Sequence, residues 1–229
     1  MAQLTGILAR VSGRLEQLIW LERHRIPFSR LWVVRSILHG ASGSTLVDIG
    51  CGDGETLRLL DAGNRFRSVG IDIFRPYLER CRDLGSHAYL VQADVRCIPL
   101  RDKSCDIVLA LEVCEHLDKD EGFALVQDLE RIAREMVIVS TPVGRYDQGP
   151  RNGNPFWAHR SRWEPSDFAA MGYLIRGSGV RGFGGDSGVA NRHPILRLLH
   201  YPISFIASVV TYFVPALSQH MICFKRLHR

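Results

Sequence analysis

From residue 45 onward, short apolar runs alternate with segments of helical periodicity, and this alternation restricts the fold more than any other feature of the chain. The runs have the length and composition of buried strands, which predicts parallel βαβ units in an α/β, doubly wound, mostly parallel sheet. In such sheets ligands bind beyond the carboxyl ends of the strands. The expected strands are 45–49, 68–72, 88–92, 106–111 and 136–140, and the expected helices between them are 56–62, 76–84 and 120–134.

The first expected strand leads into the sequence LVDIGCGDG (46–54), in which glycines stand on alternate positions. The dinucleotide pattern G-x-G-x-x-G/A fails here, because Glu55 occupies its last position and a carboxylate at a helix N-terminus repels pyrophosphate. The P-loop pattern fails too, because no Gly-Lys-Ser/Thr follows. The turn therefore indicates a nucleotide-like ligand that places no phosphate at this point.

The turn instead matches acid-x-Gly-x-Gly-x-Gly, with Asp48, Gly50, Gly52 and Gly54, and resembles the first motif of class I S-adenosylmethionine-dependent methyltransferases. The resemblance extends over about residues 45–145 and implies the seven-stranded, Rossmann-like fold of that family, as one domain over residues 1–229, with S-adenosylmethionine as cofactor. The glycines, with Cys51 between them, let the backbone pass close to the methionine moiety. An acidic residue suits the positive ammonium and sulfonium groups of the cofactor.

Acidic residues also follow the next two expected strands. Asp72, 22 residues after the first glycine of the turn, is placed to accept hydrogen bonds from both ribose hydroxyls. The resemblance implies that Asp94 receives the adenine amino group. It further implies cofactor contacts from Ile73 and Val95 at the adenine, and from Leu111 and Glu112 at the methionine part.

The segment EVCEHL (112–117) would bring Glu112, Glu115 and His116 onto one turn if it is helical. It is similar to ubiquinone-pathway O-methyltransferases and small-RNA 2′-O-methyltransferases, where such residues hold a divalent ion that polarises the hydroxyl being methylated. Two interpretations stay open. Either these three side chains bind a metal, or the segment is metal-free and His116 is structural or a base on the substrate side. His159 is a further candidate ligand or a catalytic base.

Residues 144–188 are expected to form active-site loops with a short helix at 165–171. The stretch AHRSRWEPSDFAAMGY (158–173) resembles the segment that follows the fifth strand in many small-molecule O- and C-methyltransferases. Arginines and aromatic side chains between 146 and 163 suit a polar, anionic or glycan-like acceptor. The alternative is a surface loop in which the arginines serve solubility.

Residues 1–40 form the expected helical N-terminal extension, which breaks at Pro27. They hold six arginines against two acidic residues, and the chain after Asp186 holds five basic residues and no acidic one, within a net charge of +5. These basic ends of the chain favour binding to an anionic surface, either phospholipid or nucleic acid. The alternative is that both ends are exposed to solvent and bind nothing. Six cysteines without a CxxC pair indicate a reduced, cytoplasmic protein, and charges interrupt the N-terminal apolar stretch, so no signal peptide is expected.

The most apolar segment is YPISFIASVVTYFVPAL (201–217), expected as a helix inserted before the last strand. It is shorter than the roughly 20 residues that a spanning helix needs. Ser204, Ser208 and Thr211 give it one polar stripe. Three alternatives stay open: a buried or homodimer-forming helix, an interfacial membrane helix, and a membrane span.

The resemblance therefore implies a methyltransferase, and we expect it to act on a hydroxyl, or on a carbon or nitrogen, of a small-molecule, lipid-linked or glycan acceptor, with a membrane surface as a further partner. Residues 111–114 lack the Asn/Asp-Pro-Pro-aromatic turn of enzymes that methylate planar nitrogens. The alternatives are an RNA methyltransferase, disfavoured because no RNA-binding appendage is recognisable, and a non-catalytic cofactor-binding partner subunit.

Overall fold

The computed structural model describes residues 25–60, 65–144, 147–150, 153–182 and 205–227. Seven strands form one sheet in the order β3-β2-β1-β4-β5-β7-β6. Only β7 runs antiparallel to its neighbours, β5 and β6. The strands are β1 (Thr45–Ile49), β2 (Arg67–Asp72), β3 (Tyr89–Gln92), β4 (Cys105–Leu111), β5 (Ala133–Pro142), β6 (Leu174–Ser178) and β7 (His220–Arg226). The predicted doubly wound, mostly parallel sheet of seven strands is confirmed.

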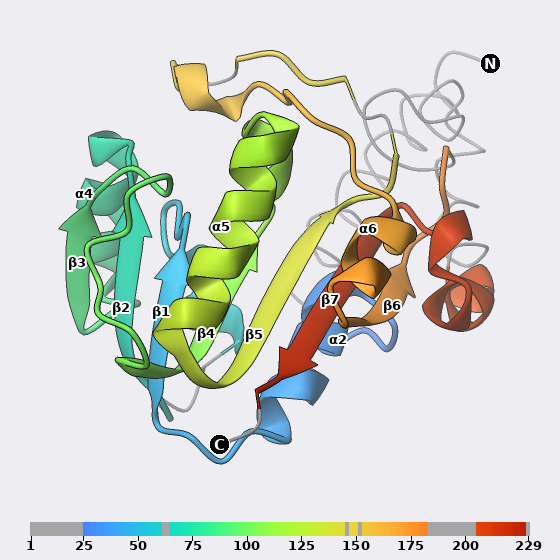
Figure 1. The fold of residues 1–229 in the computed structure, drawn as a ribbon, viewed down its shortest axis with the longest axis horizontal. Coiled ribbons are helices and arrows are strands. Elements are labelled where there is room, and N and C mark those ends of the chain that lie inside the picture. The colour runs from blue at the N-terminus through green and yellow to red at the C-terminus, as the bar shows by residue number, and fades with distance from the viewer. Residues whose placement is uncertain (1–24, 61–64, 145–146, 151–152, 183–204, 228–229) are drawn as a thin grey trace, which may run out of the picture.

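Helices cover both faces of the sheet, with α5 and α6 in front and α2 behind in the view of Figure 1. The helices are α2 (Arg30–His39), α3 (Glu55–Leu60), α4 (Arg75–Leu84), α5 (Lys119–Ile132) and α6 (Pro165–Ala170). The described residues also form three short 3-10 helices: η1 (Cys114–His116), η2 (Pro155–Trp157) and η4 (Pro215–Leu217). Because side chains of a strand alternate between faces, the central strands serve two cores. Val108 packs in the core under α5, whereas Leu109 packs in the core under α2.

The observed elements lie close to the predicted ranges. The predicted helix 120–134 starts slightly earlier, because Asp118 caps the first turn of α5 in a capping box with Glu121. The predicted strand 136–140 is longer, because β5 pairs with β7 from Met136 to Pro142. Residues 1–24, which hold most of the predicted N-terminal extension, lie outside the described residues, as do residues 201–204.

The predicted apolar helix is described from residue 205, is helical to 213, and lies between β6 and β7. Its polar stripe faces inward, because Ser208 and Thr211 are buried and the carbonyl of Thr211 lies against Gly177 of β6. Its apolar side chains face outward, and Ile206 and Phe213 are 72% and 69% exposed. No helix among the described residues has the length and hydropathy needed to cross a bilayer.

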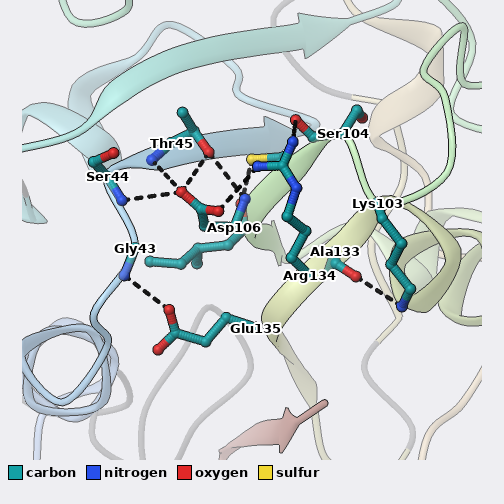
Figure 2. A network of polar contacts seen from close by, with 11 residues as sticks. Gly43, Ser44, Thr45, Lys103, Ser104, Asp106, Ala133, Arg134 and Glu135 are labelled. Atoms are coloured by element: carbon teal, nitrogen blue, oxygen red, sulfur yellow. Dashed lines mark hydrogen bonds and ion pairs between the residues drawn. The ribbon is translucent and has the colours of Figure 1, made fainter. Parts of the chain in front are cut away.

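A carboxylate joins the amino ends of β1, β4 and β5, at the edge of the sheet opposite the strands' carboxyl ends. Asp106 Oδ2 accepts hydrogen bonds from the Thr45 hydroxyl (2.7 Å) and from the backbone N–H groups of Ser44 and Thr45, and Oδ1 accepts one from Arg134 (Figure 2). Burial alone would raise the pKa of Asp106, but these hydrogen bonds outweigh it and lower the pKa to about 2.

Replacing Asp106 by asparagine is expected to lower the free energy of unfolding by about 1–2 kcal/mol at neutral pH. The folded-state pKa lies below that of an unfolded aspartate, so this stabilisation is present above about pH 4 and lost as the pH falls towards about 2. Urea unfolding across this range measures it. The exposed Asp83→Asn serves as control. A pH-independent difference between wild type and Asp106→Asn contradicts the assignment.

Candidate functional site

The site lies where the chain order of the strands reverses. From β1 the sheet continues through β2 and β3 on one side and through β4 and β5 on the other. Such a switch point opens a crevice at the carboxyl ends of the strands. A cavity of about 650 Å³ lies at this edge, lined by the glycine turn after β1, the ends of β2 and β4, the loop after β3, and residues 154–160.

The glycine turn forms one wall of the cavity. Gly50 and Gly52 have φ angles of +68° and +57°, a left-handed conformation that favours glycine. A Cβ at Gly50 would lie 2.5 Å from Val113 Cγ2, so the turn packs tightly against the segment after β4. A Cβ at Gly52 would meet no atom within 4 Å. Gly52 therefore leaves open the space that a ligand lying along the turn requires.

Two carboxylates follow the neighbouring strands. Asp72 accepts hydrogen bonds from the backbone N–H groups of Gly52 (2.9 Å) and Phe74 (2.8 Å), so its side chain is fixed at the edge of the cavity. Burial raises the pKa of Asp72, although these N–H groups oppose the shift. Asp94 forms an ion pair with Arg96 at 2.6 Å, and the guanidinium lowers the pKa of Asp94.

The cavity brings together most of the residues predicted for the cofactor and for catalysis. Those lining it are Gly50, Cys51, Gly52, Asp72, Ile73, Asp94, Val95, Leu111, Glu112, His116 and His159. Two predicted cofactor residues, Asp48 and Gly54, do not line the cavity, and their contact with the cofactor stays a prediction. Asp48 is buried behind the turn with its Oδ2 3.2 Å from His87 Nε2. Gly54 faces Ser86 and Cys81, where a side chain would collide.

A second group of polar side chains faces the turn across the cavity. Glu115, His116 and His159 place their ligand-type atoms within 4.8 Å of one another. The backbone fixes this arrangement, because the carbonyl of Glu115 accepts hydrogen bonds from the N–H groups of Arg160 (2.7 Å) and Ser161 (3.2 Å). The ring of His116 places Nδ1 3.2 Å from the carbonyl of Ala158. These contacts hold η1 against the loop that carries His159.

This group is poorly solvated. Glu115 is 2% exposed, and its Oε2 has no hydrogen-bond partner among the described residues. Burial and the neighbouring charge of Glu112 hold the pKa of Glu115 well above its usual range. Burial also lowers the pKa of His116, so its imidazole is held neutral. A carboxyl with one unpartnered oxygen, beside two imidazoles, has the donor set of a site for a divalent cation.

Glu112 does not join this group, which corrects the expectation that Glu112, Glu115 and His116 share one helical turn. Glu112 has a φ angle of +61°, and the 3-10 helix η1 begins only at Cys114. Its carboxylate lies 2.9 Å from Arg30 Nη1 and 3.2 Å from His220 Nε2, and it accepts a hydrogen bond from Ser140 (2.8 Å). Burial opposes ionisation, but these partners lower the pKa of Glu112 well below its usual range.

Residues 47–146 match a protein family described as a methyltransferase domain. A probable S-adenosylmethionine-dependent methyltransferase of Mycolicibacterium smegmatis is 28% identical over 134 residues, which cover 58% of this chain and 49% of that protein. This chain contains a class I S-adenosylmethionine-dependent methyltransferase domain. It spans about half the length of the mycobacterial relative that it matches.

Two further comparisons extend beyond the family match. The small RNA 2′-O-methyltransferase of Arabidopsis thaliana is 28% identical over 176 residues, 69% of this methyltransferase and 19% of the plant protein. The putative methyltransferase in a Haloferax volcanii complex with the activator Trm112 has a TM-score of 0.57 at 15% identity, covering 92% of this chain and 96% of that one. At this identity the likeness concerns the fold alone.

S-adenosylmethionine is the cofactor of this methyltransferase family, and the residues of the cavity fit it. Gly52 leaves room along the turn, and the oxygens of Asp72 retain lone pairs for a ribose diol. Arg30 and Tyr77 also line the cavity and were not predicted from the sequence. Neither belongs to a motif, and only the packing of α2 and α4 brings them to the site.

Proposed function

We propose that this methyltransferase transfers the methyl group of S-adenosylmethionine to a hydroxyl oxygen of its acceptor. The observation that supports the proposal most directly is that Glu115, His116 and His159 line the same cavity as Gly52 and Asp72. One carboxylate and two imidazoles suit a divalent transition-metal cation such as Mn²⁺. When bound there, the cation supplies a Lewis acid that favours the ionised form of the acceptor hydroxyl.

The chain's own residues perform the remaining tasks. The glycine turn and Asp72 fix the cofactor, so that the reacting groups meet in line within one enclosed space. The side chains of Tyr77 and Trp157 pack edge to face, with ring centroids 6.0 Å apart, and both line the cavity. They offer aromatic faces to an acceptor that carries a ring. Arg160 and Asn154, which also line the cavity, suit an acceptor with polar or anionic groups.

A small-molecule, lipid-linked or glycan acceptor is the first candidate. The second is RNA, favoured by one observation: the match to the plant small RNA 2′-O-methyltransferase reaches beyond the cofactor-binding core and covers 69% of the chain. Either class of acceptor would present a hydroxyl group to the proposed cation.

Incubation with methyl-labelled S-adenosylmethionine and separated lipid, small-molecule and RNA fractions of a lysate tests the proposal. We expect label in an O-methyl ether, lost with a chelator and restored by Mn²⁺. Label in RNA, with binding that weakens steeply with salt, selects the second candidate. Label on nitrogen or carbon, or transfer unaffected by the chelator, contradicts the proposal. No transfer by the purified chain supports the partner-subunit alternative instead.

We also propose that the helix 205–213 brings the enzyme to a membrane surface. Its outward apolar face and the basic residues nearby in the sequence suit an anionic phospholipid layer. The double variant Phe205→Ser/Phe213→Ser is expected to lose flotation with vesicles that contain phosphatidylserine. Leu84→Ser/Tyr89→Ser, which removes exposed apolar side chains at the other end of the sheet, should float like wild type. Absence of wild type from the lipid fraction contradicts this proposal.

A further inference from the structure

Behind the glycine turn lies a cluster of reactive side chains that the methyl-transfer chemistry does not use. Cys51, Cys81 and His87 place their sulfur and nitrogen atoms within 4.8 Å of one another. Cys51 belongs to the turn, Cys81 to α4, and His87 to the segment between α4 and β3. Both cysteines are free thiols and are buried. Three elements therefore bring two thiols and an imidazole together directly behind the cofactor cavity.

The cluster is arranged as a chain of hydrogen bonds that ends on a sulfur. Asp48 Oδ2 lies 3.2 Å from His87 Nε2, and His87 Nδ1 lies 3.1 Å from Cys81 Sγ. The hydroxyl of Ser86 lies 3.2 Å from the same sulfur. A carboxylate that orients an imidazole against a thiol is an arrangement that activates cysteine as a nucleophile. This accounts for the burial of Asp48 away from the cavity.

The electrostatics of the cluster agree with this geometry. The hydrogen bond from Cys51, with those from His87 and Ser86, outweighs burial and lowers the pKa of Cys81 to about 5. Burial would lower the pKa of His87, but Asp48 and Cys81 raise it to about 9. Both shifts favour the thiolate form of Cys81 and the imidazolium form of His87. Interaction with Cys81 and burial raise the pKa of Cys51, so Cys51 remains a protonated thiol beside the thiolate.

Cys51 lines the cofactor cavity, whereas Cys81 behind it is fully buried, so a reagent in the cavity meets Cys51 before Cys81. A small oxidant that enters the cavity in the absence of cofactor reaches the wall behind which Cys81 lies. A bound cofactor would lie along the same turn and cover it. Accessibility of the thiol pair is thereby tied to whether the cavity is filled.

We propose that Cys81 and Cys51 form a modification site, in which hydrogen peroxide oxidises Cys81 and Cys51 resolves the product as a disulfide. The Cys81 thiolate attacks one peroxide oxygen, the O–O bond breaks, and Cys81 becomes a sulfenic acid while hydroxide leaves and takes a proton to form water. The Cys51 sulfur then attacks the Cys81 sulfur, the S–O bond breaks, and the hydroxyl leaves as water with the proton of Cys51. Two thiols lose two electrons in total, and one peroxide is reduced to two waters.

The disulfide would change cofactor binding, because it ties the turn to α4. The Cys51 N–H now donates to the carbonyl of Ile71 (3.0 Å), which sets the position of the turn between Gly50 and Gly52. A covalent S–S bond of about 2.05 Å draws Cys51 towards α4 and shifts both glycines. Formation of the disulfide does not depend on the acceptor. Only its effect on affinity depends on the cofactor binding at this turn.

Treatment of the reduced full-length protein with hydrogen peroxide, followed by peptide mass spectrometry, tests the proposal. We expect a Cys51–Cys81 linked peptide in wild type and in the control Cys97→Ser, which removes an exposed cysteine. The linked peptide should be absent from Cys81→Ser, and Cys51→Ser should accumulate a Cys81 sulfenic acid that dimedone traps. Saturating S-adenosylmethionine should slow the reaction. Thiols that stay reduced, oxidation confined to Cys97, or stoichiometric zinc bound to these thiols in the purified protein overturns the proposal.

Calorimetry then measures the consequence for the cofactor. The oxidised protein is expected to bind S-adenosylmethionine about tenfold more weakly, and a thiol reductant should restore the affinity. Peroxide-treated Cys81→Ser should bind like untreated Cys81→Ser. A disulfide without an affinity change contradicts the link to the turn. Failure of the reduced protein to bind the cofactor contradicts the proposed function instead.

Discussion

Gly52→Val is expected to abolish measurable binding of S-adenosylmethionine, weakening the affinity by more than about a hundredfold. Gly52 stands where a Cβ would meet nothing within 4 Å and would project into the open cavity. A valine there would fill the space in which the methionine moiety of the cofactor is predicted to lie. The left-handed φ of +57° adds strain of at least about 1–2 kcal/mol, which lowers stability as well. Isothermal calorimetry measures the affinity, and thermal unfolding measures the strain.

Gly85→Val separates these two effects. Gly85 ends α4 with a φ of +65°, and a Cβ there also meets nothing within 4 Å. The two variants therefore introduce the same side chain under similar backbone strain, but only Gly52 lines the cavity. Gly85→Val should lose stability and keep its affinity for the cofactor. Equal loss of affinity in both variants shows that strain, and not occupation of the cavity, explains the result.

The ranges of the first five strands could be predicted from the sequence, because buried parallel strands appear as continuous apolar runs, whereas β6 and β7 were expected only from the family resemblance. Strand β1 was predicted with its observed bounds, and Asp72 was predicted at the end of β2, where it lines the cavity. The positions of these residues follow from strand ends alone. Any parallel sheet brings the carboxyl ends of its strands to one edge, so contacts between distant residues become predictable there.

Contacts that depend on side-chain direction could not be predicted in the same way. Asp48 carries the acid of the glycine motif, yet its partner His87 lies 39 residues later on a segment without a motif. Glu112 has the spacing of a helical ligand, but its positive φ separates it from η1 and turns it to Arg30 and His220. The hydrophobic periodicity of a sequence does not predict that a single residue adopts the left-handed backbone conformation. The polar face of the 205–213 helix was predicted, but not that this face would be the buried one.

For the group Glu115, His116 and His159, the residues could be predicted from the sequence but their mutual contact could not. The sequence offered all three residues, but the contact of His159 with the other two required the backbone of Glu115 to bind Arg160 and Ser161. A pair of matched substitutions distinguishes the observed group from the predicted one. Glu115→Gln and Glu112→Gln make the same chemical change three residues apart. The two glutamates contact different side chains, so the two substitutions disrupt different interactions.

Glu115→Gln and His159→Gln are each expected to reduce metal-dependent methyl transfer by about a hundredfold or more, because each removes a proposed ligand of the cation. Titration with Mn²⁺, followed by calorimetry or paramagnetic resonance, measures the same loss without any acceptor. Glu112→Gln should retain Mn²⁺ binding, because its carboxylate is already held by Arg30, His220 and Ser140. If Glu112→Gln abolishes Mn²⁺ binding while Glu115→Gln preserves it, the cation belongs to Glu112. If Mn²⁺ binding is unchanged in all three variants, the cation does not bind in this cavity, and His159 remains the candidate base.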